Sequence, residues 1–519
     1  MKKVCKVVIN SVSHDARVVK QATSLKSNGY DVSIIGIQDA KNEVPYEVTE
    51  EGIKIYRVAW RSKAIIPTSF FFIFSILGIL SLTAAAIFSV NFADSMLSNL
   101  NLTFPEFINL DLNSIWKPLI YISVFILAML FVSKIYNDYQ ASIGSYTNVR
   151  KQEDEVELKY NLEGIERIFA EERKFSDNFI WLTPRILALG FGSLFNVNTS
   201  KMFRAIFARE SKISEILHEI KPDIVHAHDV YALPVASQYK KRGKSKLVFD
   251  AHELYDHLAQ SNNEHSMLNK FLLKKYSKSV DMFITINESF EKYYSIAYPK
   301  FPPAIVIKNA ARTSEKFKYD GRLHDAAGID RKKKILLYQG GFADKRGLQS
   351  LLLSANYLSN DWQLVFMGWG NFKVELDKTL ELMKLKNNGQ EINVKFVKTA
   401  PQEELPLWSS GATVGVIPYE NSGLNHWYCT PNKLWEYPNA GVPILGSPFP
   451  EIRKVVEGHE VGWLLPDPLE PKEIAEIVNN LEIDEISQAS KNCKKYMKID
   501  NWSVYEKRLL KGYRELNGK

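Results

Sequence analysis

Residues 430–445, TPNKLWEYPNAGVPIL, place a lysine and a glutamate three positions apart inside an apolar and aromatic stretch. Side chains three apart on a helix are neighbours, so Lys433 and Glu436 are expected to lie side by side. Charged residues are seldom packed among aromatic ones without a partner or a ligand. Trp435 and Tyr437 therefore favour a half-buried binding site over a helix start that simply faces water.

Residues 339–348, QGGFADKRGL, bring two glycines and an arginine together after an apolar strand. Gly340 and Gly341 allow a phosphate to approach the backbone, and the N-terminus of the helix that follows favours an anion. Arg346 adds a planar fork of donors that matches phosphate oxygens. A glycine loop around Gly368, in FMGWGNF, is a weaker signal of the same kind. The sequence therefore predicts a phosphate-binding site.

Two further strands end in histidine and carboxylate side chains. His226 and His228 lie two apart in PDIVHAHD, hence on one face of a strand, and Asp229 follows them. This spacing suits metal ligands, or a polar strand end beneath a binding surface. The rest of a metal cage is missing, so we favour the second interpretation and expect no metal. His252 ends the next strand, VFDAHE, as either a functional or a structural group.

These residues need elements that bring them to one edge of a sheet. The chain begins with a strand at 4–9, a helix at 16–27 and a strand at 32–37, which predict a parallel βαβ unit. The alternation of strand and helix returns at 222–287, and a second series follows a charged linker at 316–334. We therefore predict two doubly wound α/β domains that bind ligands at the carboxyl ends of their strands.

Length and composition fit this organisation. A chain of 519 residues suggests two or three domains, and 45% hydrophobic with 24% charged residues is typical of a globular protein. The net charge of +7 is mild, and no basic run with interleaved aromatics predicts nucleic-acid binding. Cys5, Cys429 and Cys493 are well separated, which predicts neither disulfides nor zinc. No signal peptide is expected, so the N-terminus stays in the cytosol.

A long apolar run interrupts this pattern. Residues 65–90 are 26 residues without a charge, enough to span a bilayer, and 119–132 form a shorter second run. The loop at 91–114 contains acidic residues but no lysine or arginine, whereas basic residues flank the outer ends of the pair. By the positive-inside rule, a transmembrane hairpin would enter from the cytosol and return to it. A buried helical pair and a membrane-embedded hairpin that does not span remain alternatives. A third apolar segment, 180–197, is either interfacial or packed.

Six motifs, in chain order, resemble the retaining glycosyltransferases of family 4, of the bacterial surface-polysaccharide type. They are SHDARVVKQATSL, PDIVHAHDVYALP, VFDAHELY, YQGGFADKRGL, TPNKLWEYPNAGVPIL and GWLLPD. The resemblance implies an α/β GT-B fold of two facing Rossmann-like domains. Residues 1–60 and 141–315 would form the acceptor-side domain, with the hairpin inserted at 61–140. Residues 316–500 would bind the nucleotide sugar, and 501–519 would cross back to the N-terminal domain.

The resemblance also implies roles for single residues. Arg346 and Lys433 would stabilise the negative charge of a leaving diphosphate. Glu436 would accept hydrogen bonds from the ribose hydroxyls, and His252 would contact the transferred sugar. These four form the predicted catalytic group. The other donor-side residues are Gly340, Gly341, Gly368 and Tyr428, and the acceptor-side residues are His14, Arg17, His228, Asp229, Asp250 and Glu253.

The chain departs from the family pattern at two positions. The first of the family's two glutamates falls on Tyr428, and an arginine that many members carry near the first glycines falls on Gly341, for which Lys433 could compensate. Arg17 either binds an acceptor phosphate or caps a helix.

The predicted function is a membrane-associated enzyme that transfers a sugar from a nucleotide-diphosphate sugar to a lipid-linked glycan, in polysaccharide biosynthesis such as that of lipopolysaccharide or capsule. It would act at the cytoplasmic membrane with its catalytic domains facing the cytosol, without a cofactor or catalytic metal. Its partners would be the nucleotide sugar, the lipid acceptor and the membrane, and not nucleic acid. Two alternatives remain, a GT-B sugar-nucleotide epimerase and a catalytically inactive scaffold that binds sugar nucleotide.

Overall fold

The computed structural model describes residues 1–13, 15–38, 44–58, 212–243, 245–258, 263–313, 318–388, 391–401 and 403–518. The predicted hairpin runs at 65–90 and 119–132, the apolar segment at 180–197 and the candidate His14 lie outside these residues. Among the helices within the described ranges, none is both long enough and apolar enough to cross a bilayer.

The N-terminal sheet has eight strands in the order β3-β4-β2-β1-β5-β6-β7-β8. Every neighbouring pair is parallel except β3 and β4. The βαβ unit predicted at the start of the chain is confirmed as β1, α1 and β2. The elements are β1 (Lys3–Val7), α1 (Ala16–Ser27), β2 (Asp31–Ile37), β3 (Tyr46–Val48), β4 (Lys54–Val58), β5 (Ile224–His228), α7 (Leu233–Arg242), β6 (Lys246–Ala251), α8 (Asn263–Tyr276), β7 (Met282–Thr285), α9 (Glu288–Ala297) and β8 (Ala304–Val306).

The second sheet has six parallel strands in the order β11-β10-β9-β12-β13-β14. Part of the expected linker at 316–334 is helical, since α10 lies within it. The elements are α10 (Arg322–Ala327), β9 (Lys334–Gly341), α11 (Leu348–Ser354), β10 (Trp362–Trp369), α12 (Lys373–Lys386), β11 (Val394–Val397), α13 (Leu405–Ser409), β12 (Val414–Ile417), α14 (Leu424–Trp427), α15 (Lys433–Asn439), β13 (Ile444–Gly446), α16 (Pro450–Val456), β14 (Gly462–Leu464) and α17 (Pro471–Asn479).

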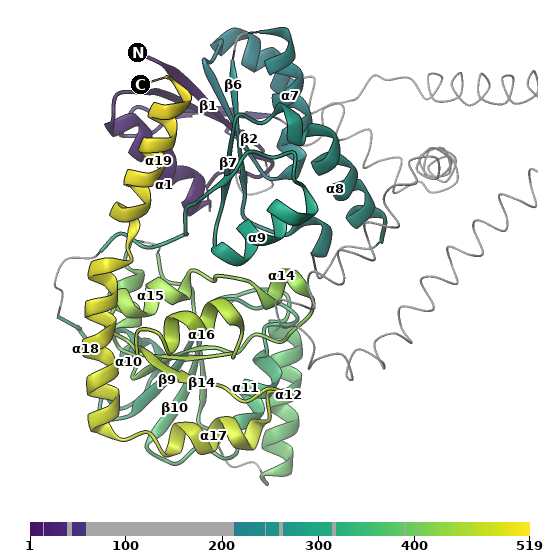
Figure 1. Ribbon diagram of the computed structural model, residues 1–519. Helices are drawn as coiled ribbons and strands as arrows, with labels where there is room; N and C mark the ends of the chain where they lie inside the picture. The colour runs from purple at the N-terminus through teal and green to yellow at the C-terminus, as the bar shows by residue number, and fades with distance from the viewer. Residues whose placement is uncertain are drawn as a thin grey trace, which may run out of the picture. The chain divides into compact units, whose positions relative to one another are not determined.

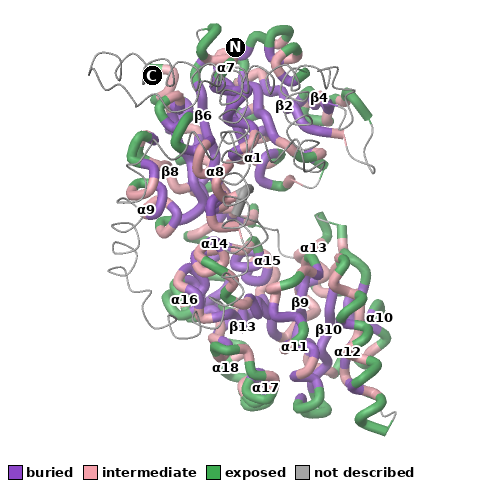
Figure 2. The backbone as a smooth tube through the Cα atoms, turned by 90° about the vertical axis from the view of Figure 1, so that its right-hand side faces the viewer, coloured by how far each residue is buried: buried purple, intermediate pink, exposed green. Residues whose placement is uncertain are grey.

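The strands of both sheets form the buried cores, because helices cover both faces of a parallel sheet. Figure 2 shows the buried central strands with exposed residues on the outer helices. All five residues of β5 are buried, and so are the four of β12. This explains why β12, with the sequence VGVI, reads as a continuous apolar run instead of an alternating one.

Two long helices end the chain, α18 (Ile483–Ile499) and α19 (Trp502–Leu516). Figure 1 shows α19 beside α1, next to the N-terminal strands. The indole Nε1 of Trp502 donates to Ser24 Oγ at 3.0 Å, and the hydroxyl of Tyr513 lies 2.7 Å from His226 Nδ1. The last helix is therefore part of the packing around the N-terminal sheet.

Each sheet has one position where the strand order reverses. In the N-terminal sheet the reversal lies between β1 and β5, and in the second sheet between β9 and β12. Open α/β sheets bind ligands beyond the carboxyl ends of the strands at such positions. Most of the predicted site residues lie at or after the carboxyl ends of β5, β6, β9 or β12.

Candidate active site

Two cations, Arg346 and Lys433, lie close to the reversal point of the second sheet, and neither has a carboxylate partner in the described part of the chain. The guanidinium carbon of half-buried Arg346 stacks 4.3 Å from the ring centroid of Tyr419. Lys433 is 8% exposed, and its Nζ donates to the Tyr419 hydroxyl at 3.4 Å and lies 5.1 Å from the Tyr338 ring. Among the residues described, neither cation has an ion-pair partner. Two neighbouring unpaired cations make this a site for an anion.

Glycines at two strand ends give these cations room. Gly340 has φ +124°, and a Cβ there would lie 3.0 Å from Lys433 Nζ. Gly368 pairs with Gly340 across β9 and β10, and its Cβ would lie 1.9 Å from the Gly340 carbonyl oxygen. Gly341 follows at the exposed end of β9. The three predicted donor-side glycines therefore lie together at the carboxyl ends of β9 and β10, where Gly340 is close to Lys433.

Gly347 fixes the start of α11 directly after Arg346. It has φ +62°, and an added Cβ would lie 1.7 Å from the Pro418 carbonyl oxygen. We expect Gly347→Ala to lower the melting temperature strongly, because a left-handed alanine alone costs about 1–2 kcal/mol and the backbone clash adds to it. Gly328→Ala is the matched control, since Gly328 has φ +64° with no atom within 4 Å of an added Cβ. Equal losses in the two variants would contradict the clash.

Glu436 lies on α15, in the turn after Lys433, and is half-buried. Its Oε2 accepts a hydrogen bond from Gln339 Nε2 at 2.9 Å. The Ser409 hydroxyl in turn donates to Gln339 Oε1 at 2.6 Å. The buried glutamine therefore orients the carboxylate. The burial of Lys433 also excludes the alternative in which both charges simply face water.

Tyr428, at the position of the family's first glutamate, is 6% exposed. Its carbonyl oxygen accepts a hydrogen bond from Asn287 Nδ2 at 2.8 Å. Asn287 also donates to the Thr430 hydroxyl. The tyrosine thus belongs to a packed segment directly before α15.

His252 and Asp229 form an ion pair at the ends of two neighbouring strands. His252 Nε2 lies 3.0 Å from Asp229 Oδ1, and the Tyr255 hydroxyl donates to the same oxygen at 3.0 Å. Burial opposes a charge on His252, but the Asp229 carboxylate outweighs it and raises the pKa of His252 to about 9. At neutral pH the ring is therefore an imidazolium.

Glu253 faces the second half of the chain. Its Oε2 accepts a hydrogen bond from Asn425 Nδ2 at 2.6 Å, and the backbone N–H of Leu254 donates to Asn425 Oδ1 at 2.7 Å. Burial raises the pKa of Glu253. Asn425 on α14 therefore connects the end of β6 to the segment that leads into α15.

Three expected acceptor-side residues are buried, two in the N-terminal sheet and one on the helix α1. His228 and Asp250 have no exposed surface, and Arg17 is 4% exposed. Arg17 donates to both carboxylate oxygens of Asp250, at 2.9 and 2.7 Å, and to the carbonyl oxygen of Ile307. Burial opposes a charge on Asp250, but the Arg17 guanidinium outweighs it and lowers the pKa of Asp250.

The contacts of Arg17 and Asp250 correct two expectations. The cap of α1 is Asp15, whose side chain accepts from the Val18 N–H, so Arg17 does not cap the helix. Because ion-paired side chains at this depth offer no surface to an acceptor, we replace the expected direct contacts of Arg17, His228 and Asp250 with a supporting role beneath the site.

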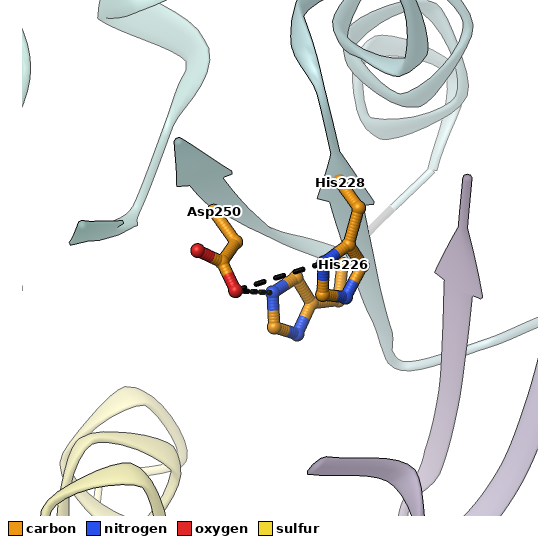
Figure 3. A group of neighbouring side chains, drawn as sticks. All are labelled: His226, His228 and Asp250. Atoms are coloured by element: carbon orange, nitrogen blue, oxygen red, sulfur yellow. Dashed lines mark ion pairs between the residues drawn. The ribbon is translucent and has the colours of Figure 1, made fainter. Parts of the chain in front are cut away.

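Figure 3 shows one oxygen of Asp250 facing the rings of His226 and His228. The distances are 3.9 Å to His226 Nε2 and 3.6 Å to His228 Nδ1, so the three residues offer ligand atoms at a spacing that suits a metal ion. On the other side of both rings, Lys6 Nζ lies 3.1 Å from His226 Nδ1 and 3.0 Å from His228 Nε2. Lys6 and Arg17 would both repel a metal cation, so we interpret the group as a buried polar network.

This network predicts how stability depends on pH. Burial lowers the pKa of Lys6 to about 7, and burial with Lys6 nearby lowers the pKa values of His226 and His228. The unfolded histidines bind protons first, so the melting temperature should fall as pH drops below about 6.5. Unfolded Lys6 keeps a proton that the folded state loses above pH 7, so Lys6 adds stability from there towards about pH 10. His252 acts in the opposite direction up to about pH 9, because its folded form holds a proton that the unfolded form loses.

Melting temperatures across both pH ranges check this expectation, with Lys6→Met as the control, which should gain less stability than wild type at alkaline pH. The same change in melting temperature at alkaline pH in both proteins, or no fall at acidic pH, would contradict it.

Sequence comparison gives the family. The model of the glycosyl transferases group 1 matches residues 321–500, and that of glycosyltransferase family 4 matches residues 186–315. The chain is a retaining glycosyltransferase of family 4. A comparison with curated proteins gave no match.

Solved structures agree on the GT-B fold of this glycosyltransferase. Sucrose-phosphate synthase from Thermosynechococcus elongatus is similar with a TM-score of 0.62 at 12% identity, covering 100% of both chains. A trehalose-6-phosphate structure from E. coli, bound with UDP-2-fluoro glucose, has a TM-score of 0.57 at 11% identity, covering 98% of both. HepE from Anabaena, in complex with UDP, has a TM-score of 0.50 at 14% identity, covering 59% of this chain and 82% of its own.

Several residues that shape the site of the glycosyltransferase were not predicted. Gln339 directly precedes the paired glycines, and Tyr419 follows β12, so the rule of polar residues at strand ends could have found both. Lys6 stands in a strand that is otherwise apolar, and such a charge is a signal of a buried partner. Asn425 and Tyr255 carry no comparable signal.

Proposed function

We propose that this glycosyltransferase is membrane-associated and transfers its sugar from a nucleotide-diphosphate sugar to a lipid-linked glycan in polysaccharide biosynthesis. The observation that carries the donor side of the proposal is the pair of unpaired cations, Arg346 and Lys433, beside the glycines at the end of β9. Glu436 stands in the next turn of the helix, held by Gln339, where it can accept hydrogen bonds from two ribose hydroxyls.

The proposed reaction keeps the configuration of the anomeric carbon. The bond from that carbon to the diphosphate oxygen breaks, and the acceptor hydroxyl oxygen forms a new bond on the same face. The proton of the acceptor hydroxyl moves to the leaving phosphate. Arg346 and Lys433 stabilise the negative charge that grows on the diphosphate. Because they supply this positive charge themselves, we propose that no catalytic metal is needed.

The membrane part of the proposal depends on the sequence. The uncharged run at 65–90 is long enough to span a bilayer, and the basic flanks favour a hairpin with both ends in the cytosol. The insertion at 61–140 would hold the acceptor-side domain, 1–60 and 141–315, at the inner face of the cytoplasmic membrane. A lipid-linked substrate cannot leave that surface, so anchoring raises the rate of encounter.

A donor screen tests the proposed function. Membranes containing the enzyme are incubated with a panel of labelled nucleotide sugars, and the lipids are extracted. We expect label in the lipid fraction with one donor, no loss of transfer in EDTA, and no label with a Lys433→Ala variant. Conversion of the free nucleotide sugar without lipid labelling would indicate an epimerase instead, and no reaction with any donor would contradict the proposal.

Excising the hairpin separates anchoring from catalysis. We expect replacement of residues 65–132 by a short flexible linker to reduce transfer to a lipid-linked acceptor sharply, and to reduce transfer to a water-soluble acceptor analogue much less. Only the first reaction depends on sharing a two-dimensional surface. The measurement is the ratio of the two turnover rates in wild type and variant.

Donor binding and melting temperature are the controls for this variant, because the insertion interrupts the sequence of the N-terminal sheet. Equal losses on both acceptors in a folded variant would show that the segment shapes the active site instead of anchoring it.

A further inference from the structure

The ion pair between Asp229 and His252 lies at the ends of two adjacent strands, β5 and β6. These strands are parallel, with His228 opposite Asp250. Asp229 directly follows His228, and His252 comes two residues after Asp250; Asp229 Oδ1 lies 3.0 Å from His252 Nε2. The sheet register therefore sets the distance between the two groups.

The backbone of Asp229 is held in an unusual conformation. Its φ is +68° and its ψ is 153°, a region that almost only glycine occupies. Such strain persists where the surrounding structure imposes it, and it is concentrated at functional sites. Here the Tyr255 hydroxyl donates to Oδ1 at 3.0 Å, the same oxygen that contacts His252. The strained residue is thus fixed at both its backbone and its side chain.

One nitrogen of His252 is left without a partner. Nε2 is bound by Asp229, whereas the buried Nδ1 has no hydrogen-bond partner among the described residues. An imidazolium is a donor at both nitrogens. A buried charged donor without an acceptor is unfavourable, so a bound ligand is the natural source of the missing acceptor.

The charges around His252 favour its protonated form. Asp250 raises the pKa of His252 in addition to Asp229, and Arg17 lowers it. The Asp250 carboxylate is itself occupied by Arg17 and Gln21, so Asp229 is the one carboxylate that contacts the ring in the described part of the chain. The other ionisable groups that interact with His252 are Glu253, Tyr255, His226 and His228.

We propose that Asp229 is a positioning residue that fixes the ring of His252 and keeps it an imidazolium, so that Nδ1–H donates a hydrogen bond to the transferred sugar. This inference rests on the proposed function, and on the contact between His252 and the transferred sugar that the family resemblance implies. It replaces the expected role of Asp229 as a direct acceptor contact, because His252 and Tyr255 both bind Oδ1 of its carboxylate. Asp229 touches no reacting atom, and its effect on the reaction passes through His252.

The test is the pH dependence of kcat/KM with a water-soluble acceptor, for wild type, Asp229→Asn and Tyr255→Phe. Asparagine has nearly the same size and shape as aspartate, so it removes the charge with the least disturbance. We expect wild-type activity to fall near pH 9 and the Asp229→Asn activity to fall at a pH lower by about one to three pH units. Tyr255→Phe keeps the charge and should keep the wild-type midpoint. An unchanged midpoint in Asp229→Asn would overturn the proposal.

A measurement that needs no activity separates this inference from the proposed function. Proteins labelled with carbon-13 at histidine Cε1 are titrated by NMR, and the His252 signal is assigned by its loss in His252→Gln. We expect its pKa to lie near 9 in wild type and lower in Asp229→Asn. A wild-type His252 that titrates near the ordinary value of about 6.5 would overturn the pairing, even if transfer to the acceptor is confirmed. The expected titration in a protein that transfers no sugar would leave the pairing correct and the proposed function wrong.

Discussion

Arg346→Ala is expected to lower kcat by about 100- to 1,000-fold, equivalent to about 2.7 to 4 kcal/mol of transition-state stabilisation. The half-buried guanidinium is stacked on Tyr419 and has no carboxylate partner among the residues described, so its charge is available to the leaving diphosphate. That charge grows as the glycosidic bond breaks, so the loss should appear mainly in kcat and less in the affinity for the donor. Steady-state kinetics with the donor at saturation measures it.

Two variants control this experiment. Arg346→Lys should restore activity only in part, because an ammonium lacks the planar fork of the guanidinium. Lys345→Ala removes a positive charge from the neighbouring position, where the lysine is paired with Glu420 at 3.4 Å, and should leave kcat close to that of wild type. If Arg346→Ala keeps turnover within a few-fold of wild type, the arginine does not stabilise the leaving group.

Glu436→Ala is expected to weaken binding of the free nucleoside diphosphate by about 10- to 150-fold, since hydrogen bonds to a charged group contribute about 1.5 to 3 kcal/mol. The ribose contacts exist both in the bound donor and in the transition state. The variant should therefore lose affinity as well as kcat/KM, which distinguishes it from Arg346→Ala. Isothermal titration calorimetry measures the affinity.

Gln339→Ala is the matched comparison for this variant. It removes the 2.9 Å hydrogen bond that orients Glu436 but leaves the carboxylate in place, so its loss of affinity should be smaller. Unchanged affinity in Glu436→Ala would show that the carboxylate does not hold the nucleotide.

The strands of both sheets could be predicted because parallel strands are buried on both faces and appear as continuous apolar runs. Short strands without such runs could not, and β14, three residues at Gly462–Leu464, is one of them. The antiparallel edge strand β3 is equally short and partly exposed. Local sequence carries too little signal for strands whose pairing depends on neighbours far along the chain.

The site was predictable only in part, for a related reason. Glycines, cations and strand ends indicated the donor side, and family resemblance assigned Glu436 its role. The partners of these groups come from distant positions: Arg17 and Asp250 are 233 residues apart in the sequence. Spacing cannot reveal such a pair. Arg17 and Asp250 were therefore expected at the surface, where they would touch an acceptor, although they form a buried ion pair between α1 and β6.

The most direct test of the account is a structure of the enzyme with bound nucleoside diphosphate, using the one that binds most tightly in calorimetry. The account predicts diphosphate oxygens within hydrogen-bond distance of both Arg346 and Lys433, and ribose hydroxyls on the carboxylate of Glu436. A nucleotide bound with its diphosphate away from these two cations, or with its ribose away from Glu436, would contradict it.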